Sequence, residues 1–211
     1  NKKEFVKTVL PIIINENQNI LMIRSFVNEL KGKLETFRTL NNNEIRKLND
    51  IAKKYNIKYQ NKHKLDLVDE ILSNVDVIPN SIVLAQAAIE SGWGKSRFAK
   101  EYNALFGEYT YDDSEGVIPL ERKNGDTHLI KAFSSYSNSV ESYFDNINSH
   151  YAYEEFRDIR NIMRKRNNFS NVNLLVNKLS TYAEDENYIK TIRQVIKTNN
   201  FGIFDQKTIS Y

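Results

Sequence analysis

The sequence contains no cysteine, three prolines, one tryptophan and three histidines among its 211 residues. The absence of cysteine excludes disulfide bonds, thiolate metal sites and cysteine nucleophiles. The histidines, His63, His128 and His150, are far apart, and the chain has no H-E-x-x-H motif, glycine-rich phosphate loop or G-x-S-x-G segment. These absences disfavour metal and nucleotide chemistry, so we expect no metal ion and no cofactor.

Strong charge and long apolar runs are also lacking. The formal net charge is only +3, which suits an anionic partner such as a cell wall, a membrane surface or a nucleic acid without choosing among them. No stretch approaches the ~20 apolar residues of a membrane-spanning helix. No export signal is visible, and because the chain begins at Asn1 this absence carries no information.

Helix-breaking residues are concentrated in the middle of the chain, where five of the seven glycines lie between Gly92 and Gly125. The rest is typical of helices. We expect Pro11 to kink or divide the first helix, and a second helix to end near Gly32. Asn138 is expected to cap a later helix. Apolar residues at helical spacing predict the other helices, at about 43–52, 65–72, 80–91, 153–163, 174–179 and 185–196.

The central segment, residues 116–133, predicts one β-hairpin. Asn124-Gly125 between two β-prone runs is typical of a two-residue type I′ turn. Counting outward from that turn pairs Glu121 with His128. The predicted fold class is therefore mainly α with one small β-hairpin lobe.

One carboxylate interrupts the most apolar helix, in the segment VLAQAAIESGWGKSRF at residues 83–98. Glu90 falls in the last turn, where the helix dipole disfavours negative charge by ~0.3–1 kcal/mol. Burial against Trp93 would disfavour the charged form further. Both effects raise the pKa, as a general acid requires near neutral pH. The alternative is an exposed carboxylate without a role at a frayed helix end.

The segment AQAAIESGWGKSRFAKEYNALFG, residues 85–107, resembles the signature of the Bax-like bacterial β-N-acetylglucosaminidases. They belong to the glycoside hydrolase family of flagellar and autolysin-type glucosaminidases. Glu90 stands at the acid position of its A-x-x-E-S-x-W-G motif, and N-x-L-F-G follows. The similarity continues through residues 116–160 and TYAEDENYIKTI, which is similar to the family's Y-A-x-D-x-x-Y segment. Together the motifs cover roughly residues 79–196.

This resemblance implies a lysozyme-like fold with a glycan cleft between an α lobe and a small β lobe. It implies cleavage of the β-1,4 bond after N-acetylglucosamine in peptidoglycan, with Glu90 as general acid. Glu121 would be the base or the stabiliser of an oxocarbenium ion, and the alternative is a surface pair of Glu121 with His128. Tyr182 would lie in the cleft and orient the 2-acetamido group or the attacking water. Tyr188, on an apolar helix face, is expected in the core.

Candidate residues for glycan contact come from the same segments. Small and polar motif residues let a glycan approach closely, and aromatic rings suit the apolar faces of sugars. Four acids between Glu108 and Glu115 are interpreted as a solvated loop. The candidates are Gln86, Ser91, Trp93, Asn103, Phe106, Gly107, Tyr109, Tyr111, His128 and Tyr188.

Outside these motifs, Arg157, Arg160 and Arg164 repeat along one helix, which favours a solvated face over a surface for an anionic polymer or partner. We expect residues 1–75 to form a helical region packed on a catalytic domain at 76–211. Peptidoglycan is the expected partner, outside the cytoplasm, with a membrane protein or membrane anchor as a further expectation. A lytic transglycosylase and a non-catalytic glycan-binding or partner-binding adaptor are the alternatives, and a nucleic-acid module is disfavoured by the low charge.

Overall fold

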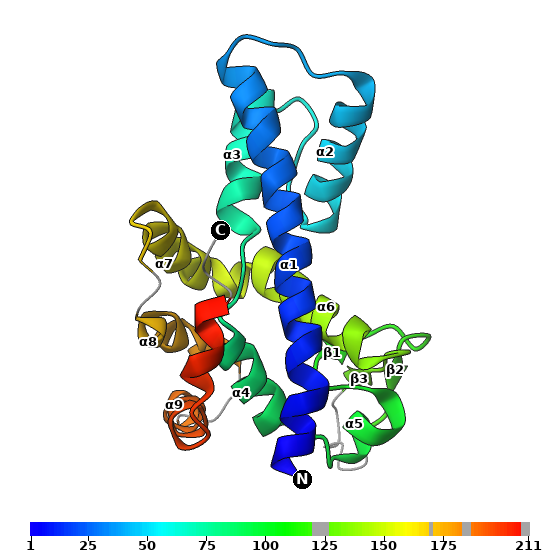
Figure 1. Cartoon of the computed structure of the whole chain (residues 1–211). Coiled ribbons are helices and arrows are strands. Elements are labelled where there is room, and N and C mark those ends of the chain that lie inside the picture. Colours follow the sequence, from blue (N-terminus) through cyan, green and yellow to red (C-terminus); the bar gives the residue numbers. More distant parts are fainter. Residues whose placement is uncertain (120–126, 169–170, 183–186, 208–211) are drawn as a thin grey trace.

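The computed structural model of the chain describes residues 1–119, 127–168, 171–182 and 187–207. Helices dominate it, and three short strands form one small antiparallel sheet (Figure 1). This confirms the predicted class, mainly α with a small β part. The elements are α1 (Lys2–Glu35), α2 (Asn42–Lys54), α3 (Lys64–Asn74), α4 (Asn80–Glu90), α5 (Arg97–Tyr102), β1 (Tyr109–Thr110), β2 (Gly116–Val117), β3 (Leu129–Lys131), α6 (Tyr136–Ser149), η1 (Tyr151–Tyr153), α7 (Glu154–Lys165), α8 (Val172–Val176), η2 (Asn177–Tyr182), α9 (Tyr188–Thr198) and η3 (Phe201–Lys207).

The chain begins with one long helix where two were expected. α1 continues through Pro11 and past Gly32 to Glu35, so the predicted division and the predicted end near Gly32 are wrong. A proline removes one backbone hydrogen bond, and packing holds the helix together across that gap. The buried apolar residues of α1 are Phe5, Val9, Ile13, Ile20, Val27 and Leu30. At ~1.5 Å per residue the helix is ~50 Å long, and it runs along most of the molecule (Figure 1).

Two helices, α2 and α3, pack beside the second half of α1 (Figure 1). α2 begins with a capping box: the Asn41 side chain accepts hydrogen bonds from the Asn43 and Glu44 amides, and the Glu44 carboxylate accepts one from the Asn41 amide. These bonds satisfy amide groups that the first turn of a helix leaves free. The predicted helix near residue 43 is confirmed.

Helix α4 is central and buried, as the sequence predicts. It follows Pro79, and its residues from Asn80 to Ala88 are all buried. α1, α9 and η3 pack around it. Only Glu90, in the final turn, and its neighbour Ile89 are partly exposed. The helix therefore fixes a single carboxyl group at the edge of the core.

Two predicted helix starts differ from the structure. α6 is capped by Ser135, whose hydroxyl accepts a hydrogen bond from the Asn138 amide, so the prediction of Asn138 as the cap is wrong. Asn138 instead accepts a hydrogen bond from that hydroxyl through its side chain. The last helix begins at Tyr188, and the expected start at residue 185 lies outside the described residues.

The small sheet has the order β1-β3-β2, with both pairs antiparallel. β2 and β3 form the predicted hairpin, but Val117 pairs with Ile130, whereas a two-residue turn at 124–125 would pair it with Ala132. The register is therefore two residues away from the predicted one. The turn itself and Glu121 lie outside the described residues. β1 was not predicted, since two residues are too short for an alternating pattern to show.

The arginines of α7 do not form a solvated face, so that prediction is wrong. Arg160 and Arg157 are buried, and each binds main-chain carbonyl groups at the ends of neighbouring helices. Arg164 binds the fully buried carboxylate of Asp76 with two nitrogens, at 2.9 and 2.5 Å, and Arg24 of α1 lies 3.4 Å from the same carboxylate. These arginines join α1, the end of α3 and α7 around Asp76.

The N-terminal residues share the core of the rest of the chain. Buried side chains from Phe5 to Phe201 form a continuous cluster, and α1 packs against both α4 and α6. The division into residues 1–75 and 76–211 stays a prediction. In the part of the chain that the structure describes, no helix has the length and apolarity needed to cross a membrane.

Candidate active site

The candidate site begins at the C-terminal end of α4. Glu90 is partly exposed, and the backbone leaves the helix there through a turn in which Gly92, Trp93 and Gly94 all have positive φ. Burial raises the pKa of the Glu90 carboxyl above its ordinary value, although a hydrogen bond from Tyr188 acts in the opposite direction. A carboxylic acid that keeps its proton more readily is suited to donate it.

A chain of hydrogen bonds ends on this carboxyl. Tyr143 donates from its hydroxyl to the Gln86 side-chain oxygen at 2.6 Å, Gln86 donates to the Tyr188 hydroxyl at 3.0 Å, and Tyr188 donates to Glu90 Oε1 at 2.7 Å. In each of these three hydrogen bonds the donor lies on the side away from Glu90 and the acceptor on the side toward it. Because Tyr143 and Gln86 are fully buried, this network fixes the orientation of the carboxyl and occupies Oε1.

The second oxygen of the carboxyl faces Gly107. This residue has φ +62°, and a Cβ atom built on it would lie 3.7 Å from Glu90 Oε2. The absence of a side chain leaves room beside Oε2, and a non-glycine residue would be strained there. The proton of a protonated Glu90 can therefore sit on Oε2, on the side that the Tyr188 hydrogen bond leaves open.

The two tyrosines of the third motif stack on each other, and only Tyr188 contacts Glu90. Tyr188 was expected in the core, and it is buried, but its hydroxyl contacts Glu90 directly. Tyr182 was expected in the cleft, and its hydroxyl donates to the main-chain oxygen of Phe106 at 3.0 Å. The two rings are parallel, with centroids 5.9 Å apart. Tyr182 therefore supports Tyr188 and the segment that leads to Gly107.

Four predicted glycan-contact residues have partners within the protein. Gln86 and Ser91 are fully buried; both ends of the Gln86 amide are engaged, and the Ser91 hydroxyl bonds Ala87 and Gly94 within the turn. The Asn103 side chain binds the Phe133 carbonyl oxygen, and the Phe106 ring stacks on Tyr143 at 4.2 Å. Their contact with a glycan stays a prediction.

Two exposed candidates lie in β1 and directly after it. Tyr109 and Tyr111 are 64% and 77% exposed, and the Tyr109 ring stacks on His128 with centroids 4.2 Å apart. His128 was predicted to face Glu121, which lies outside the described residues. The exposed rings are available for stacking on a sugar.

Glu108 was missed by the sequence analysis, because it was interpreted as part of a solvated loop. Its Oε2 accepts a hydrogen bond from Ser142 of α6 at 3.0 Å, and its Oε1 is buried without a partner among the described residues. Burial raises the pKa of Glu108 to about 7. In the sequence only its position next to Gly107 could have indicated this.

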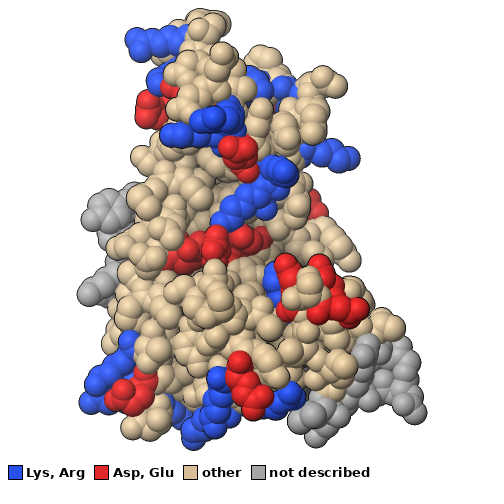
Figure 2. Space-filling model, turned by 90° about the vertical axis from the view of Figure 1, so that its right-hand side faces the viewer, with Lys and Arg blue, Asp and Glu red and all other residues tan. Residues whose placement is uncertain are grey.

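A second titratable carboxyl lies further along α6. Burial raises the pKa of Asp145 to about 6, against the nearby ammonium group of Lys54, which lowers it. Lys54 of α2 also pairs with Glu141 at 2.7 Å. On the side of the molecule where α2 and α6 lie, Figure 2 shows a band of acidic side chains below a group of basic ones. Among the described residues no group of three or more His, Asp or Glu is placed to hold a metal ion.

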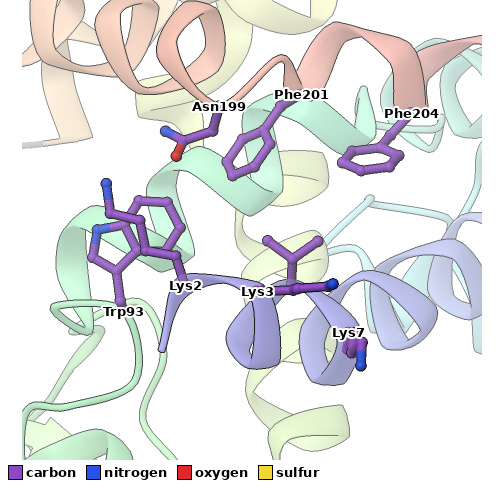
Figure 3. Close-up of a pocket in the computed structure, with 8 residues that line it drawn as sticks. Lys2, Lys3, Lys7, Trp93, Asn199, Phe201 and Phe204 are labelled. Carbon is purple, nitrogen blue, oxygen red and sulfur yellow. The ribbon is translucent and has the colours of Figure 1, made fainter.

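The Trp93 ring has aromatic and cationic partners in the core and at the start of α1. It packs on Phe5 and Phe201, with centroids 5.7 and 6.1 Å away, and Lys2 lies over its face (Figure 3). These contacts belong to a groove at the C-terminal end of α9, whereas Glu90 contacts Tyr188 at the N-terminal end of that helix.

A helical scaffold that presents one carboxyl beside a small sheet agrees with the family comparison. The family model described as Glucosaminidase, mannosyl-glycoprotein endo-beta-N-acetylglucosaminidase, matches residues 65–201. The chain belongs to this glucosaminidase family, which confirms the family expected from the motifs.

Among known proteins, the chain is similar to Protein bax of Escherichia coli (strain K12), with 33% identity over 184 residues, 86% of this chain and 63% of that protein. It is also similar to the peptidoglycan hydrolase FlgJ of the same strain, with 34% identity over 92 residues, 39% of this chain and 29% of FlgJ. The chain thus spans less than two thirds of these relatives. Among solved structures, the catalytic domain of the autolysin Auto from Listeria monocytogenes matches with a TM-score of 0.48 and 18% identity, over 90% of this chain and 97% of that one.

Proposed function

We propose that the protein is a peptidoglycan hydrolase that cleaves the β-1,4 bond between N-acetylglucosamine and N-acetylmuramic acid, an endo-β-N-acetylglucosaminidase. Membership of the glucosaminidase family and the similarity to FlgJ, a peptidoglycan hydrolase by name, support the reaction class. The observation that carries the proposal is the Glu90 carboxyl, which is held by Tyr188 through Oε1 and left open at Oε2 beside Gly107.

In this mechanism Glu90 acts as the general acid. Its Oε2 proton is transferred to the glycosidic oxygen as the bond from that oxygen to the anomeric carbon breaks. The raised pKa means that Glu90 holds its proton more readily than an exposed glutamate does. The carboxylate that forms is stabilised by the Tyr188 hydroxyl, because hydrogen bonds to a charged acceptor are stronger than those to a neutral one.

The second group of the mechanism is proposed from the family motif alone. Glu121 would activate the attacking water or stabilise positive charge at the anomeric carbon. The 2-acetamido group of the substrate can assist in the same step. Tyr182 would act through Tyr188 and the Phe106 segment. Tyr109, Tyr111 and His128, in and beside the sheet, would contact the glycan.

The location follows from the substrate. A peptidoglycan hydrolase acts outside the cytoplasm, in the periplasm or cell wall. We include a membrane-protein partner or membrane anchor in the proposal as the means of holding the enzyme near its polymer.

The test is mass spectrometry of purified peptidoglycan after digestion and borohydride reduction. Wild-type protein should release fragments ending in reduced N-acetylglucosamine, and Glu90→Gln should release at least 1,000-fold less, because general acid catalysis and the oriented proton are both lost. Glu101→Gln is the matched control, since Glu101 is an exposed residue of α5.

Other products would contradict the proposal. Anhydro-muramyl ends would identify a lytic transglycosylase, which breaks the bond after N-acetylmuramic acid. Binding to peptidoglycan without any product from the wild type would identify a non-catalytic adaptor.

A further inference from the structure

A hollow lies at the N-terminal end of α1. It has a volume of about 270 Å³. Its lining includes Lys2, Lys3, Lys7, Trp93, Phe201 and Phe204 (Figure 3). We call it the Trp93 groove. This volume is close to the lower limit of ~300 Å³ for small-molecule sites, so the groove suits one sugar or a short peptide and not a long strand.

The floor of the Trp93 groove is aromatic. Phe201 is buried, and its ring centroid lies 6.1 Å from Trp93 and 6.1 Å from Phe204. Phe5 packs edge-on against Trp93 from the core side. Trp93 and Phe204 are partly exposed, so they offer apolar faces on which a sugar ring or an aliphatic side chain can lie.

The rim of the groove is positively charged. Lys2, Lys3 and Lys7 are exposed in the first turns of α1. The ammonium group of Lys2 lies 4.5 Å from the Trp93 ring centroid, and Lys7 pairs with Glu4 at 3.6 Å, where both side chains are mostly exposed and the attraction is weak. Among the described residues no acid lines the groove. A complementary ligand is therefore an anion attached to a sugar or apolar group.

The lysines favour several carboxylates over one phosphate. Adjacent residues of a helix diverge by about 100°, so Lys2 and Lys3 direct their ammonium groups to different places, and Lys7 lies more than one turn further along α1. In Figure 3 these side chains are spread along the groove and do not converge on one point. A single phosphate can reach only one of them well, whereas a ligand with two or more separated carboxylates can pair with several.

We propose that the Trp93 groove is a second binding site for peptidoglycan, one that holds the carboxylate-bearing muramyl-peptide unit of a strand. The identity of the polymer rests on the proposed function. α9 connects the two sites, since Tyr188 at its start contacts Glu90 and Asn199 at its end lines the groove. Its 11 residues span ~16 Å, so the groove can retain the wall polymer while another part of it is cleaved.

The chain carries its own probe for this site, because Trp93 is the only tryptophan. The Glu90→Gln protein is titrated with a purified disaccharide-tetrapeptide muropeptide while tryptophan emission is followed. We expect a saturable change in emission. Neutral N-acetylglucosamine tetramer should produce no change, since it lacks carboxylates. The affinity for the muropeptide should fall at least tenfold between 50 and 500 mM salt, as ionic screening increases.

Charge-reversal variants then test whether the lysines of the groove bind the muropeptide. Lys3→Glu combined with Lys7→Glu should weaken muropeptide binding at least tenfold while the melting temperature stays unchanged. The matched control is Lys58→Glu together with Lys53→Glu, two exposed lysines that do not line the groove, which changes the net charge equally and should leave binding unchanged. Equal weakening by both double variants would show a non-specific charge effect and would overturn the proposal.

The outcomes separate this site from the active site. If the wild type digests peptidoglycan but the muropeptide causes no emission change, the proposed binding site in the groove is overturned. The proposed function is then unaffected. A saturable, lysine-dependent change in a protein without hydrolytic products would support the groove and remove the proposed function. A response to inorganic phosphate or to vesicles of phosphatidylglycerol, with none to the muropeptide, would overturn the proposal in favour of a phosphate ligand.

Discussion

At Glu90, burial and hydrogen bonding act on the pKa in opposite directions. Burial raises the pKa and is the larger effect, and the hydrogen bond from Tyr188 lowers it. The first effect favours the protonated acid, and the second stabilises the carboxylate left after proton transfer. The balance between them sets the pH at which the proposed general acid loses its proton.

Replacing Tyr188 with Phe should therefore raise the pKa of Glu90. Without the hydroxyl the pKa of Glu90 rises, so the alkaline limb of the kcat/KM profile for peptidoglycan digestion should move to higher pH. The rate below that limb should fall about tenfold or more, because the carboxylate formed in the transition state loses a charged hydrogen bond of about 1.5–3 kcal/mol. Measuring the rate of product formation over a range of pH gives both the position of the alkaline limb and the rate below it.

Tyr182→Phe is the control for that variant. Its hydroxyl binds the Phe106 carbonyl oxygen and not Glu90. It should lower the rate without moving the alkaline limb. An equal shift in both variants would show that the pair acts by packing alone and that Tyr188 does not tune the acid.

At the scale of elements, Glu108 connects the start of β1 to α6. Its carboxyl accepts a hydrogen bond from Ser142, and its backbone oxygen accepts one from the Lys131 amide of β3. Burial is the main cause of its raised pKa, while Ser142 and Lys131 oppose the rise. The folded protein therefore binds a proton there more tightly than the unfolded chain does.

This difference makes stability fall as pH rises. Between the unfolded pKa of Glu, 4.5, and the folded value of about 7, the folded state holds more protons, so the free energy of unfolding decreases by up to about 3 kcal/mol. In Glu108→Gln the free energy of unfolding should fall less between pH 4.5 and 7.5 than in the wild type. Some fall should remain, because Asp145 also has a raised pKa, of about 6. Urea unfolding at several pH values measures the slope.

The neighbouring loop supplies the control. Asp113→Asn changes an exposed acid a few residues further along the chain, and it should leave the slope unchanged. If Glu108→Gln also left the slope unchanged, Glu108 would be ionised and solvated in the folded protein, as the sequence analysis supposed.

The helices and the acid could be predicted because their signals are local. The apolar run before Glu90 and the turn at Gly92 and Gly94 lie within fifteen residues, and they specify a buried helix that ends at a carboxyl. The partner that holds the acid could not be predicted, since Tyr188 is 98 positions away. Periodicity showed that Tyr188 faces the core, but it does not show which polar group the hydroxyl meets there.

The same limit explains why the burial of the arginines and the register of the hairpin were predicted wrongly. The spacing of Arg157 and Arg160 shows that they share a face, but the carbonyl groups that bind Arg160 belong to Asn74 and Asp76, more than eighty residues earlier. In the hairpin, turn chemistry alone gave a register two residues away from the observed one. Strand register depends on packing as well as on the turn.

At the scale of the whole molecule, α1 and the cluster around Asp76 join the two ends of the structure. α1 packs on α3 at one end and on α4 and α6 at the other. Asp76 lies between them and binds arginines from α1 and α7. Because the buried core is continuous along α1, we expect one cooperative unfolding transition and not separate melting of residues 1–75.

Acid should weaken this connection. Burial raises the pKa of Asp76, but the hydrogen bond from Arg164 and the charges of Arg24 and Arg160 together hold it below its ordinary value. A lowered pKa contributes stability above the unfolded value of about 4, and that stability is lost as pH falls through the folded pKa. Asp76 and Glu108 therefore act in opposite pH ranges, which places maximum stability between them, in mildly acidic solution.

Asp76→Asn tests the connection directly. The substitution leaves the fully buried Arg160 and the partly buried Arg24 and Arg164 without their shared anion. Removing one partner of a buried ion pair costs about 3–5 kcal/mol, so the melting temperature should fall by about 10 °C. Calorimetry should still show a single transition, because both ends of α1 lose support together.

A matched substitution separates burial from charge. Asp69→Asn breaks a pair with Lys31 at 2.7 Å in which the Asp69 side chain is 51% exposed, so it should cost less than about 1 kcal/mol. Equal losses from Asp69→Asn and Asp76→Asn would mean that the arginine cluster has no special role. Two transitions in Asp76→Asn would mean that α1 does not transmit stability between the ends of the molecule, and that residues 1–75 unfold as the separate region predicted from the sequence.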